Sequence, residues 1–285
     1  MQELIAAICT AAGYQYRQHR QAGGGDINSC YFLSTTGAPL FLKLNDAKAY
    51  PLMFQREAEG LAALSNSKSL KIPVVIKFGI EGSFQYLLME QLEKGNPPPA
   101  FWQDFAAGLA SLHKNTAPRF GWENENYIGS LPQSNKQHAS WAAFYANERI
   151  LPLVKILYNS GHFFQADIAN AGILSQNLDE KFPPEAPSLL HGDLWSGNYI
   201  VTTGGKAAIY DPAVYYGHRE MDLGMTLLFG GFSAAFYEAY NEVFPLEKQW
   251  KERVALTQLY PLLVHAVLFG GGYILRCREI IKNFC

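Results

Sequence analysis

The polar residues whose types and spacing could do chemistry are concentrated in the segment LLHGDLWSGNYIV, residues 189–201. Two apolar runs enclose an aspartate, Asp193, and an asparagine five residues later, Asn198. A second carboxylate, Asp211, directly follows the strand-like run AAIY. Phosphoryl transfer needs such a set, because one carboxylate deprotonates the attacking hydroxyl while an amide oxygen and a second carboxylate hold Mg²⁺ against the phosphates. Each residue alone would indicate only a turn, but the interval from Asp193 to Asn198 is that of kinase catalytic loops.

A lysine and a glutamate further upstream could complete an ATP site. Lys43 lies in the strand-like run FLKL, and Glu57 lies in the helix predicted to follow it. The lysine would supply positive charge for the phosphates of ATP, and the glutamate would position the lysine. Upstream of both, the stretch AGGGDINS, with Gly24, Gly25 and Asn28, joins two predicted strands. It matches neither GxGxxG nor Walker A, so we interpret it as a flexible turn or as a loop whose backbone N–H groups approach phosphate.

The elements that must position these residues form two successive regions of different periodicity. The first, residues 1–94, contains the β-prone runs SCYFLST, PLFLKL, VVIKFG and FQYLLMEQL, and one helix from Tyr50 to Leu64 with Phe54 and Leu61 on its apolar face. After the proline-rich break KGNPPPA, the second region, residues 95–285, is mainly helical. The order of elements predicts a bilobal α+β fold of the protein-kinase-like kind, in which a small antiparallel sheet with one helix precedes a larger helical lobe.

The composition excludes several classes of protein. Of the 285 residues, 48% are hydrophobic and 17% are charged, which is typical of a globular chain with a sizeable core. A net charge of −2 gives no reason to expect nucleic acid or an anionic membrane as a partner. The four cysteines are scattered and form no CxxC pair, which favours a reduced, cytoplasmic setting.

Two apolar segments have the composition to be tested as export or membrane signals, and neither has the features of one. The N-terminal MQELIAAICTAAGY has no basic region before its apolar residues and is typical of a short amphipathic helix, not of a signal peptide. The run LYPLLVHAVLFGGGYIL, from Leu259 to Leu275, contains Pro261, His265 and three glycines and is short for a bilayer span. We expect it to be a buried core helix, and we expect no membrane partner.

The chain also contains four longer segments, GGGDINSCYFL, FGWENENYIGSLPQSN, LLHGDLWSGN and DPAVYYGHREMDLGMT. Together they closely resemble the fructosamine kinase (ketosamine-3-kinase) family, relatives of the aminoglycoside phosphotransferases and choline kinases, over nearly the whole chain. HGDxWxxN alone would indicate only the wider superfamily, whereas Trp195 and Ser196 together with NYIGSLPQ are more selective. The resemblance implies ATP-dependent phosphorylation of the sugar 3-hydroxyl of ketosamines, the rearranged products of amine glycation, with Mg²⁺, in the repair of glycated molecules.

The resemblance assigns roles to individual residues. It implies Asp193 as the base, Asn198 and Asp211 as ligands of Mg²⁺, and Lys43 with Glu57 as an ion pair. It also implies a linker whose backbone groups read the adenine ring. The linker residues are Met89, Glu90, Gln91 and Leu92.

Residues around the catalytic loop are expected to support the loop or to border the substrate. His191 is expected to hydrogen-bond the backbone, and Asp222, at a predicted helix start, to accept backbone N–H bonds that brace the loop. Trp195 either offers an aromatic face to the sugar or its chain, or is a buried core tryptophan. His218 and Glu220 are expected to border the substrate, although charged residues in loops are usually solvated.

Two departures from protein kinases narrow the substrate. Asp211 is followed by Pro212 and Ala213 where protein kinases have Phe and Gly, and no segment resembling an activation loop follows. A compact substrate therefore fits better than a peptide groove, and the sequence leaves open which ketosamine is preferred, and whether it is free or protein-linked. The alternatives are a kinase for another small alcohol or amino sugar, or a nucleotide-binding pseudokinase scaffold, which the retained Asp193 disfavours.

Cys30 lies just past the glycine-rich stretch and allows two interpretations. If its thiol is exposed, oxidation could distort the phosphate-covering loop or link two chains, and either would couple ATP turnover to redox state. If the thiol is packed in the first lobe, it is inert, which is the usual state of a free cysteine.

Overall fold

The computed structural model describes residues 1–23 and 27–285, so Gly24 and Gly25 of the glycine-rich stretch lie outside the described residues. The chain forms two compact units. Unit 1 consists of Met1–Phe101 and Tyr199–Pro212, and unit 2 consists of Trp102–Asn198 and Ala213–Cys285. One unit holds a sheet and the other is mainly helical, which is the α+β arrangement that the order of elements predicts.

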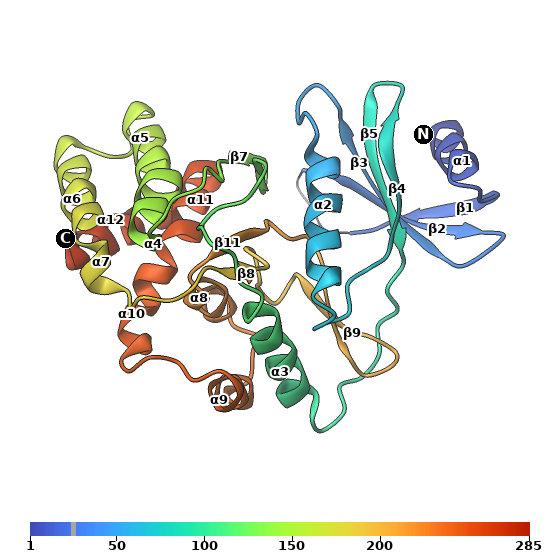
Figure 1. Cartoon of the computed structure of the whole chain (residues 1–285). Coiled ribbons are helices and arrows are strands. Elements are labelled where there is room, and N and C mark those ends of the chain that lie inside the picture. Colours follow the sequence, from blue (N-terminus) through green and yellow to red (C-terminus); the bar gives the residue numbers. More distant parts are fainter. Residues whose placement is uncertain (24–26) are drawn as a thin grey trace. The chain divides into compact units, whose positions relative to one another are not determined.

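Unit 1 is built on a five-stranded antiparallel sheet with the strand order β1-β2-β3-β5-β4 (Figure 1). β2 pairs with β1 and β3, and β5 pairs with β3 and β4, so β1 and β4 are its edges. Aromatic and aliphatic residues are frequent in these short strands, as in SCYFLST and FQYLLME, and such residues suit a pleated sheet. The strands are β1 (Tyr16–Gln21), β2 (Ser29–Thr35), β3 (Leu40–Asp46), β4 (Val75–Glu81) and β5 (Phe84–Glu90).

Side chains alternate between the two faces of this sheet, and each face meets a helix (Figure 1). Leu42 and Leu44 of β3 pack in one apolar cluster with α1 (Gln2–Ala11), the amphipathic helix predicted at the N-terminus. Lys43 lies between them and points to the opposite face, where its ammonium approaches an aromatic ring of α2 (Met53–Asn66). The alternation of side chains along β3 therefore places Lys43 on the face opposite the apolar cluster.

α2 buries the side that its periodicity predicts. Phe54, Leu61 and Leu64 are each at most 1% exposed. The helix begins at Met53, a little later than predicted, and its second turn carries Glu57. The apolar contacts of this helix with the sheet therefore fix where the carboxylate of Glu57 can reach.

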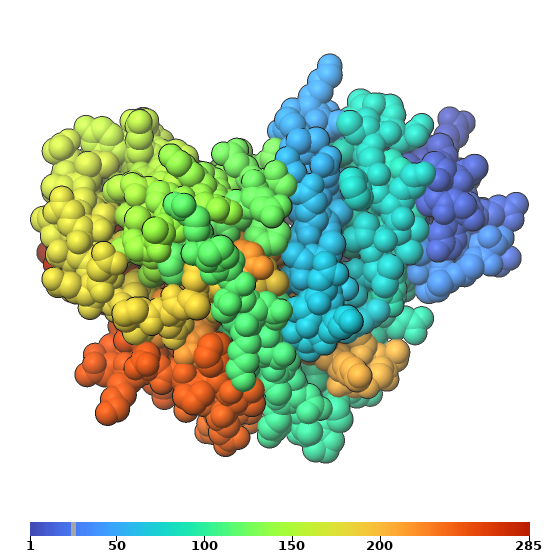
Figure 2. All heavy atoms as spheres, viewed as in Figure 1, coloured from blue at the N-terminus to red at the C-terminus, as the bar shows by residue number. Residues whose placement is uncertain are grey.

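A hairpin from a distant part of the sequence completes unit 1. β9 (Tyr199–Val201) pairs antiparallel with β10 (Ala207–Ile209), and the backbone N–H of Gly95 donates to the carbonyl oxygen of Val201 at 2.8 Å. Figure 2 shows the yellow-orange atoms of this hairpin against the green atoms of the chain that follows β5, which it joins through a bridge between Lys94 and Thr202. The predicted boundary after residue 94 is therefore corrected, because unit 1 continues to Phe101 and also takes in the hairpin.

Unit 2 is mainly helical, as predicted, and its core is one large cluster of aromatic and aliphatic side chains. α3 begins on the last residue of unit 1, and a short π-helix, η1, directly precedes α5. The helices are α3 (Phe101–His113), α4 (Trp141–Phe144), η1 (Tyr145–Ile150), α5 (Leu151–Asn159), α6 (Gln165–Gln176), α7 (Leu178–Lys181), α8 (Glu220–Leu228), α9 (Ala234–Val243), α10 (Trp250–Thr257), α11 (Leu259–Phe269) and α12 (Gly272–Phe284). Its strands pair as β6 (Asn126–Ile128) with β7 (Leu131–Gln133) and β8 (Ser188–Leu190) with β11 (Tyr215–Gly217).

The apolar run from Leu259 to Leu275 is not one helix, which corrects the prediction of a single buried one. Gly270 and Gly271 have φ values of 65° and 60°, in the region that favours glycine, so α11 stops there and α12 starts anew. Most of α11 is buried, whereas Leu275 on α12 is 59% exposed. Within the described part of the chain, no helix combines the length and the apolar character needed to cross a bilayer.

The selective segment NYIGSLPQ forms the β6–β7 hairpin, and buried amide side chains hold it in unit 2. Nδ2 of Asn126 donates to the carbonyl oxygen of Val214 at 2.9 Å, and Nε2 of Gln133 donates to that of Ala213 at 3.2 Å. Both carbonyls belong to the chain that leads into β11, the partner strand of β8. The hairpin is therefore tied to the same backbone that supports the catalytic loop.

A buried arginine is linked to this hairpin through Asn135, whose Nδ2 donates to Oδ1 of Asn126 at 2.8 Å. Arg149, from the π-helix, is 0% exposed, and its Nη2 donates to Oδ1 of Asn135 at 2.6 Å. Its guanidinium lies 4.3 Å from the ring centre of Tyr215 and 5.1 Å from that of Tyr260. Stacking on aromatic rings is a favourable setting for a buried guanidinium, so Arg149 can join the hairpin to β11 and α11.

Candidate active site

The catalytic loop follows the buried strand β8 and turns at a glycine. Gly192 has a φ of 83°, and a Cβ added there would lie 2.1 Å from the carbonyl oxygen of Ala213. The backbone N–H of Ala213 in turn donates to the carbonyl oxygen of His191 at 2.9 Å. Only glycine fits such a turn without a shift of the backbone. This contact fixes the direction in which Asp193 leaves the strand.

Asp222, in the first turn of α8, holds the start of this loop. Its Oδ2 accepts the backbone N–H of His191 at 2.8 Å, and its Oδ1 accepts that of Gly192 at 2.9 Å. Nε2 of His113 lies 3.2 Å from Oδ2, and the carboxylate is 1% exposed. Burial would raise the pKa of Asp222, but the hydrogen bond and charge of His113, with the other donors, hold it below its usual value. The backbone bonds expected of Asp222 are therefore present.

Asp193 and Asn198 are joined within the loop. Nδ2 of Asn198 donates to Oδ2 of Asp193 at 3.0 Å and to the backbone oxygen of Asp193 at 2.8 Å. Nδ1 of His191 accepts the backbone N–H of Asp193 at 3.2 Å, which is the kind of bond predicted for this histidine. The five-residue interval thus closes a turn that sets the direction of the Asp193 carboxylate.

Trp195 is not a core tryptophan. It is 37% exposed, and its indole lies against Gly197, where an added Cβ would come within 2.3 Å of the ring. The ring of Phe229 meets it edge-on, with centres 5.9 Å apart and planes at 74°. Of the two interpretations of Trp195, the exposed aromatic face is the one that agrees with this placement.

Unit 1 contains the predicted ion pair and adds a third charge to it. Nζ of Lys43 lies 2.7 Å from Oε1 of Glu57 and 2.9 Å from Oδ1 of Asp211. The side chains of Lys43 and Glu57 are 5% and 10% exposed, whereas that of Asp211 is 41% exposed. Asp211 also has a φ of 57°, a value that is uncommon outside glycine and that clusters at functional sites. The chain after β10 therefore delivers a second carboxylate to the lysine.

Burial and neighbouring charges have opposite effects on the pKa values of Lys43 and Glu57. Burial alone would lower the pKa of Lys43, but the carboxylates of Asp211 and Glu57 hold it above its usual value. Burial raises the pKa of Glu57 to about 7, although the charge of Lys43 partly offsets the rise. The lysine therefore stays charged, and Glu57 is the member that can take up a proton near neutral pH.

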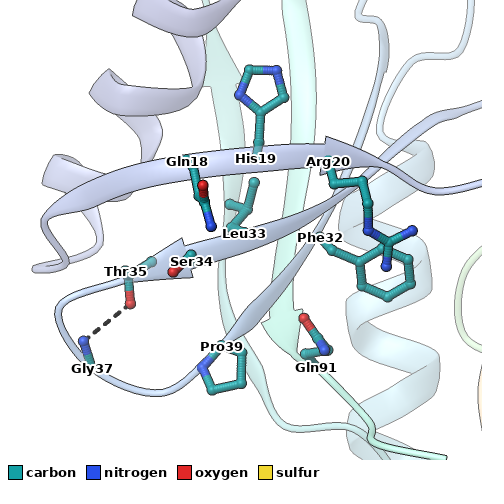
Figure 3. A pocket seen from close by; sticks show the side chains of 10 residues that line it. All are labelled: Gln18, His19, Arg20, Phe32, Leu33, Ser34, Thr35, Gly37, Pro39 and Gln91. Carbon is teal, nitrogen blue, oxygen red and sulfur yellow. Dashed lines mark hydrogen bonds between the residues drawn. The ribbon is translucent and has the colours of Figure 1, made fainter.

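Two phenylalanines on the face that carries Lys43 form an aromatic floor that was not predicted. Phe32 of β2 and Phe41 of β3 are cross-strand partners, with ring centres 5.3 Å apart. A cavity of about 460 Å³ opens beside Phe32 and is bordered by Gln91 and by Arg20, whose guanidinium carbon lies 4.4 Å from the Phe32 ring centre (Figure 3). Because side chains alternate along a strand, the run FLKL already places Phe41 on the face of Lys43, and this signal could have identified it.

The linker predicted to read adenine runs along and past the end of β5. Met89 is 3% exposed within the sheet, and Glu90 ends the strand with its carboxylate bonded to neighbours in unit 1. The backbone N–H of Gln91 donates to the carbonyl oxygen of Pro39 at 3.3 Å, and Leu92 follows outside the strand. The N–H of Glu90 donates to the carbonyl oxygen of Val74 at 2.8 Å, so the N–H groups of Glu90 and Gln91 both have partners. The carbonyl oxygen of Glu90 and the backbone groups of Leu92 are therefore the candidates for reading a base.

His218 and Glu220 were predicted to border the substrate, and the structure corrects this. His218 is 0% exposed, and its Nε2 lies 3.3 Å from the carbonyl oxygen of Pro183. Glu220 is 1% exposed, and its Oε2 accepts from Nε of Arg253 at 2.9 Å. Both side chains are packed in the interior of unit 2 with internal partners, so neither offers a surface to a substrate.

Asn28, within the glycine-rich stretch, and Cys30, just after it, both contact or pair with β3. Oδ1 of Asn28 accepts from Nδ2 of Asn45 on β3 at 2.9 Å. Cys30 is paired with Lys43 in the sheet register and is 8% exposed, and burial raises the pKa of its thiol to about 11. These observations agree with the packed, inert thiol and not with the exposed one.

The residues predicted to hold Mg²⁺ offer oxygen donors that suit this cation. Asp211 contributes a carboxylate and Asn198 an amide oxygen, and Mg²⁺ is usually bound by one or two such side chains together with substrate phosphates. In residues 1–23 and 27–285, no group of three or more His, Cys, Asp or Glu residues could hold a metal ion by itself. The chemistry of the two predicted donors thus fits Mg²⁺ bound together with ATP.

Known proteins are similar to this chain over most of its length. The model of the fructosamine kinase family matches residues 1–285. A Synechocystis protein described as a probable ketoamine kinase is 38% identical over 276 residues, which cover 96% of this chain and 92% of that protein. The chloroplastic protein-ribulosamine 3-kinase of Arabidopsis thaliana is 35% identical over 270 residues, which cover 92% of this chain and 81% of that protein.

Solved structures agree with these relatives. A crystal structure described as that of a fructosamine-3-kinase from Thermobifida fusca matches with a TM-score of 0.89 and 34% identity, over 98% of this chain and 97% of that chain. An aminoglycoside phosphotransferase solved with ADP and hygromycin B matches with a TM-score of 0.67 and 15% identity, over 99% and 98% of the two chains, which indicates a shared fold alone. The predicted protein-kinase-like fold is confirmed, and the chain belongs to the fructosamine kinase family.

Proposed function

We propose that this protein is an ATP-dependent kinase that phosphorylates the 3-hydroxyl of the sugar in ketosamines, and that it acts in the repair of glycated amines. The observation that carries the proposal is the catalytic loop, in which Asp222 holds the backbone while Asn198 holds the carboxylate of Asp193. Membership of the fructosamine kinase family and relatives described as ketoamine and ribulosamine kinases support the substrate class.

Asp193 is the base in this proposal. The oxygen of the C3 hydroxyl attacks the γ-phosphorus of ATP while its proton passes to the carboxylate of Asp193. The bond from that phosphorus to the oxygen bridging the β-phosphate breaks, and ADP leaves with the electron pair. The amide of Asn198, 3.0 Å from Oδ2 of Asp193, keeps the carboxylate oriented during the transfer. Asp193 then releases the proton to water, and the products are ADP and the 3-phosphorylated ketosamine.

Charged residues bind the phosphates. Lys43 supplies positive charge for the α- and β-phosphates, and Glu57 positions it at 2.7 Å. Asn198 and Asp211 hold Mg²⁺, which neutralises charge on the phosphates when it is bound. Because Nζ of Lys43 lies 2.9 Å from Oδ1 of Asp211, two distant segments of the chain bring a phosphate-binding cation and a metal-binding carboxylate together in unit 1.

The adenine base lies on the aromatic floor of unit 1. Phe32 and Phe41 offer apolar ring faces on the same side of the sheet as Lys43, which suits a planar base. The carbonyl oxygen of Glu90 and the backbone groups of Leu92 read the edge of the base, because the N–H groups of Glu90 and Gln91 are already bonded. Met89 separates the base from the interior of the sheet.

The decisive experiment combines purified protein with ATP, Mg²⁺ and a panel of ribulosamine, erythrulosamine, fructosamine and aminoglycoside compounds. Product mass would identify phosphorylation, and NMR would locate the phosphate. We expect phosphate on the C3 oxygen of at least one ketosamine and none with Asp193→Asn. Phosphorylation of aminoglycosides alone would overturn the substrate class, and binding of ATP without transfer to any compound would favour a scaffold.

A further inference from the structure

A row of four aromatic side chains, three exposed and one half-buried, leads away from the catalytic loop within unit 2. The ring centres of Trp195 and Phe229 are 5.9 Å apart, those of Phe229 and His265 are 5.2 Å apart, and those of His265 and Phe269 are 5.6 Å apart. Trp195, Phe229 and Phe269 are 37%, 41% and 59% exposed. We call these four residues the aromatic row.

The aromatic row starts next to the proposed base. Trp195 lies two residues after Asp193 in the catalytic loop. The helix α11 joins the row through His265, whose ring centre lies 5.2 Å from that of Phe229. A group bound along the row is therefore adjacent to a substrate hydroxyl held at Asp193.

His265 gives the row a hydrogen-bond acceptor. Its Nδ1 lies 2.7 Å from the carbonyl oxygen of Pro261, and a carbonyl oxygen can only accept, so Nδ1 carries the proton. In the neutral ring Nε2 is then an acceptor, and it makes no hydrogen bond to any residue that the structure describes. Aromatic faces beside a nitrogen lone pair are suited to a substituted ammonium group, which is attracted to both.

We propose that Phe229 and His265 form the subsite for the protonated amine of the ketosamine, with the ammonium over the Phe229 ring and one of its N–H groups donating to Nε2 of His265. This inference rests on the proposed ketosamine kinase activity. In a ketosamine the amine is attached to C1, two carbons from the C3 hydroxyl that Asp193 deprotonates. The amine must therefore lie next to the sugar, where the aromatic row begins.

The same geometry sets the substrate class. A secondary alkylamine is protonated near neutral pH, and a cation over an aromatic face is more favourable than a neutral group of equal size. The alkyl chain attached to the amine would continue along the row toward Phe269. The subsite thus selects a sugar joined to a cationic alkylamine over the free sugar, which has neither the charge nor the chain.

The test compares two substrates that differ at one atom. One is ribulose with an alkylamine on C1, and the other is the ether in which oxygen replaces the amine nitrogen. kcat/KM for both is measured with the wild type, Phe229→Leu, Phe229→Tyr, His265→Leu and the control Phe164→Leu. Phe164 is a matched control because it is a 58% exposed phenylalanine of unit 2 that lies outside the aromatic row.

The wild type should prefer the amine over the ether by about tenfold, the range expected for a cation on an aromatic face. Phe229→Leu and His265→Leu should each lower this preference by about threefold or more, chiefly through KM for the amine. Phe229→Tyr keeps a ring and should keep the preference, and Phe164→Leu should change neither substrate.

The subsite would be overturned, while the kinase activity stands, if Phe229→Leu and His265→Leu lowered kcat/KM equally for the amine and the ether. It would also be overturned if both variants kept the wild-type preference for the amine. Failure of the wild type to phosphorylate either substrate would overturn the proposed function and the subsite with it. Thermal melting shows whether each variant is folded, and if Phe229→Leu is not, His265→Leu and Phe229→Tyr decide the outcome.

Discussion

The two units hold their central charged residues in different ways. In unit 1, the ammonium of Lys43 has two carboxylate partners, Glu57 and Asp211, at 2.7 and 2.9 Å. In unit 2, the carboxylate of Asp222 accepts two backbone N–H groups, those of His191 and Gly192, at 2.8 and 2.9 Å. Carboxylates can be protonated or can exchange partners with a phosphate, whereas backbone N–H groups do neither. We infer that unit 1 is arranged to exchange partners when ATP binds and that unit 2 is arranged to keep one geometry.

The largest effect is expected at Asp193, the proposed base, which lies in the loop that Asp222 holds. Asp193→Asn should lower kcat by roughly a hundredfold or more, because the general base is lost, while the affinity for ATP stays near that of the wild type. Turnover is measured with the ketosamine panel and ATP affinity by calorimetry. Near-normal phosphorylation by a folded Asp193→Asn protein would contradict the assignment of the base.

The second prediction compares the loss of stability when Asp222 in unit 2 or Lys43 in unit 1 is replaced. Asp222→Ala removes the acceptor of two buried N–H groups and should lower the free energy of unfolding by about 3 kcal/mol. Lys43→Met should cost less, because Glu57, with a pKa of about 7, can take up a proton when its cation is removed. Denaturant unfolding of both variants at neutral pH provides the measurement. A larger loss in Lys43→Met than in Asp222→Ala would reverse the comparison.

The third prediction concerns the carboxylate that Lys43 shares. Asp211→Asn should lower the rate at limiting Mg²⁺ by about tenfold, because a charged oxygen is a better ligand for this hard cation than a neutral amide. High Mg²⁺ should restore part of the activity. Initial rates across a magnesium series test this, with Glu59→Gln on the same unit as a control of equal charge change. The same magnesium requirement in wild type and Asp211→Asn would place Asp211 outside the metal site.

The sequence predicted the catalytic loop well because its geometry is local. The interval from Asp193 to Asn198 corresponds to one turn closed by a side-chain amide, and Gly192 supplies the positive φ at its start. The ion pair between Lys43 and Glu57 was likewise predictable, because a strand and the helix that follows it are neighbours in the chain and in space. Short-range patterns therefore predicted most of the contacts seen within the candidate site.

What the sequence did not predict depends on long-range contacts. Nothing local to the segment after Asn198 indicates that it pairs with the chain near Lys94, so the domain boundary was misplaced. His218 and Glu220 are charged or polar, which usually indicates exposure, and only their buried partners show that they are structural. The aromatic row was also missed, because its members come from separate elements and share no spacing.

The smallest expected effect is a pH dependence that belongs to unit 1 alone. The raised pKa of Glu57, about 7, means that the folded chain binds a proton here at a pH where the unfolded chain has already lost it. The contribution of Glu57 to the free energy of unfolding is therefore present below the ordinary glutamate pKa and is lost as pH rises through about 7. Over the same pH range the carboxylate of Glu57 becomes charged and pairs with Lys43.

The KM for ATP should rise by up to about tenfold from about pH 8 to about pH 6, as Glu57 takes up its proton. Glu57→Gln cannot titrate, so its KM should be high at both values and change less. Ionisation of ATP affects both proteins equally, so a pH profile of KM that is the same in wild type and Glu57→Gln would show that Glu57 does not position Lys43.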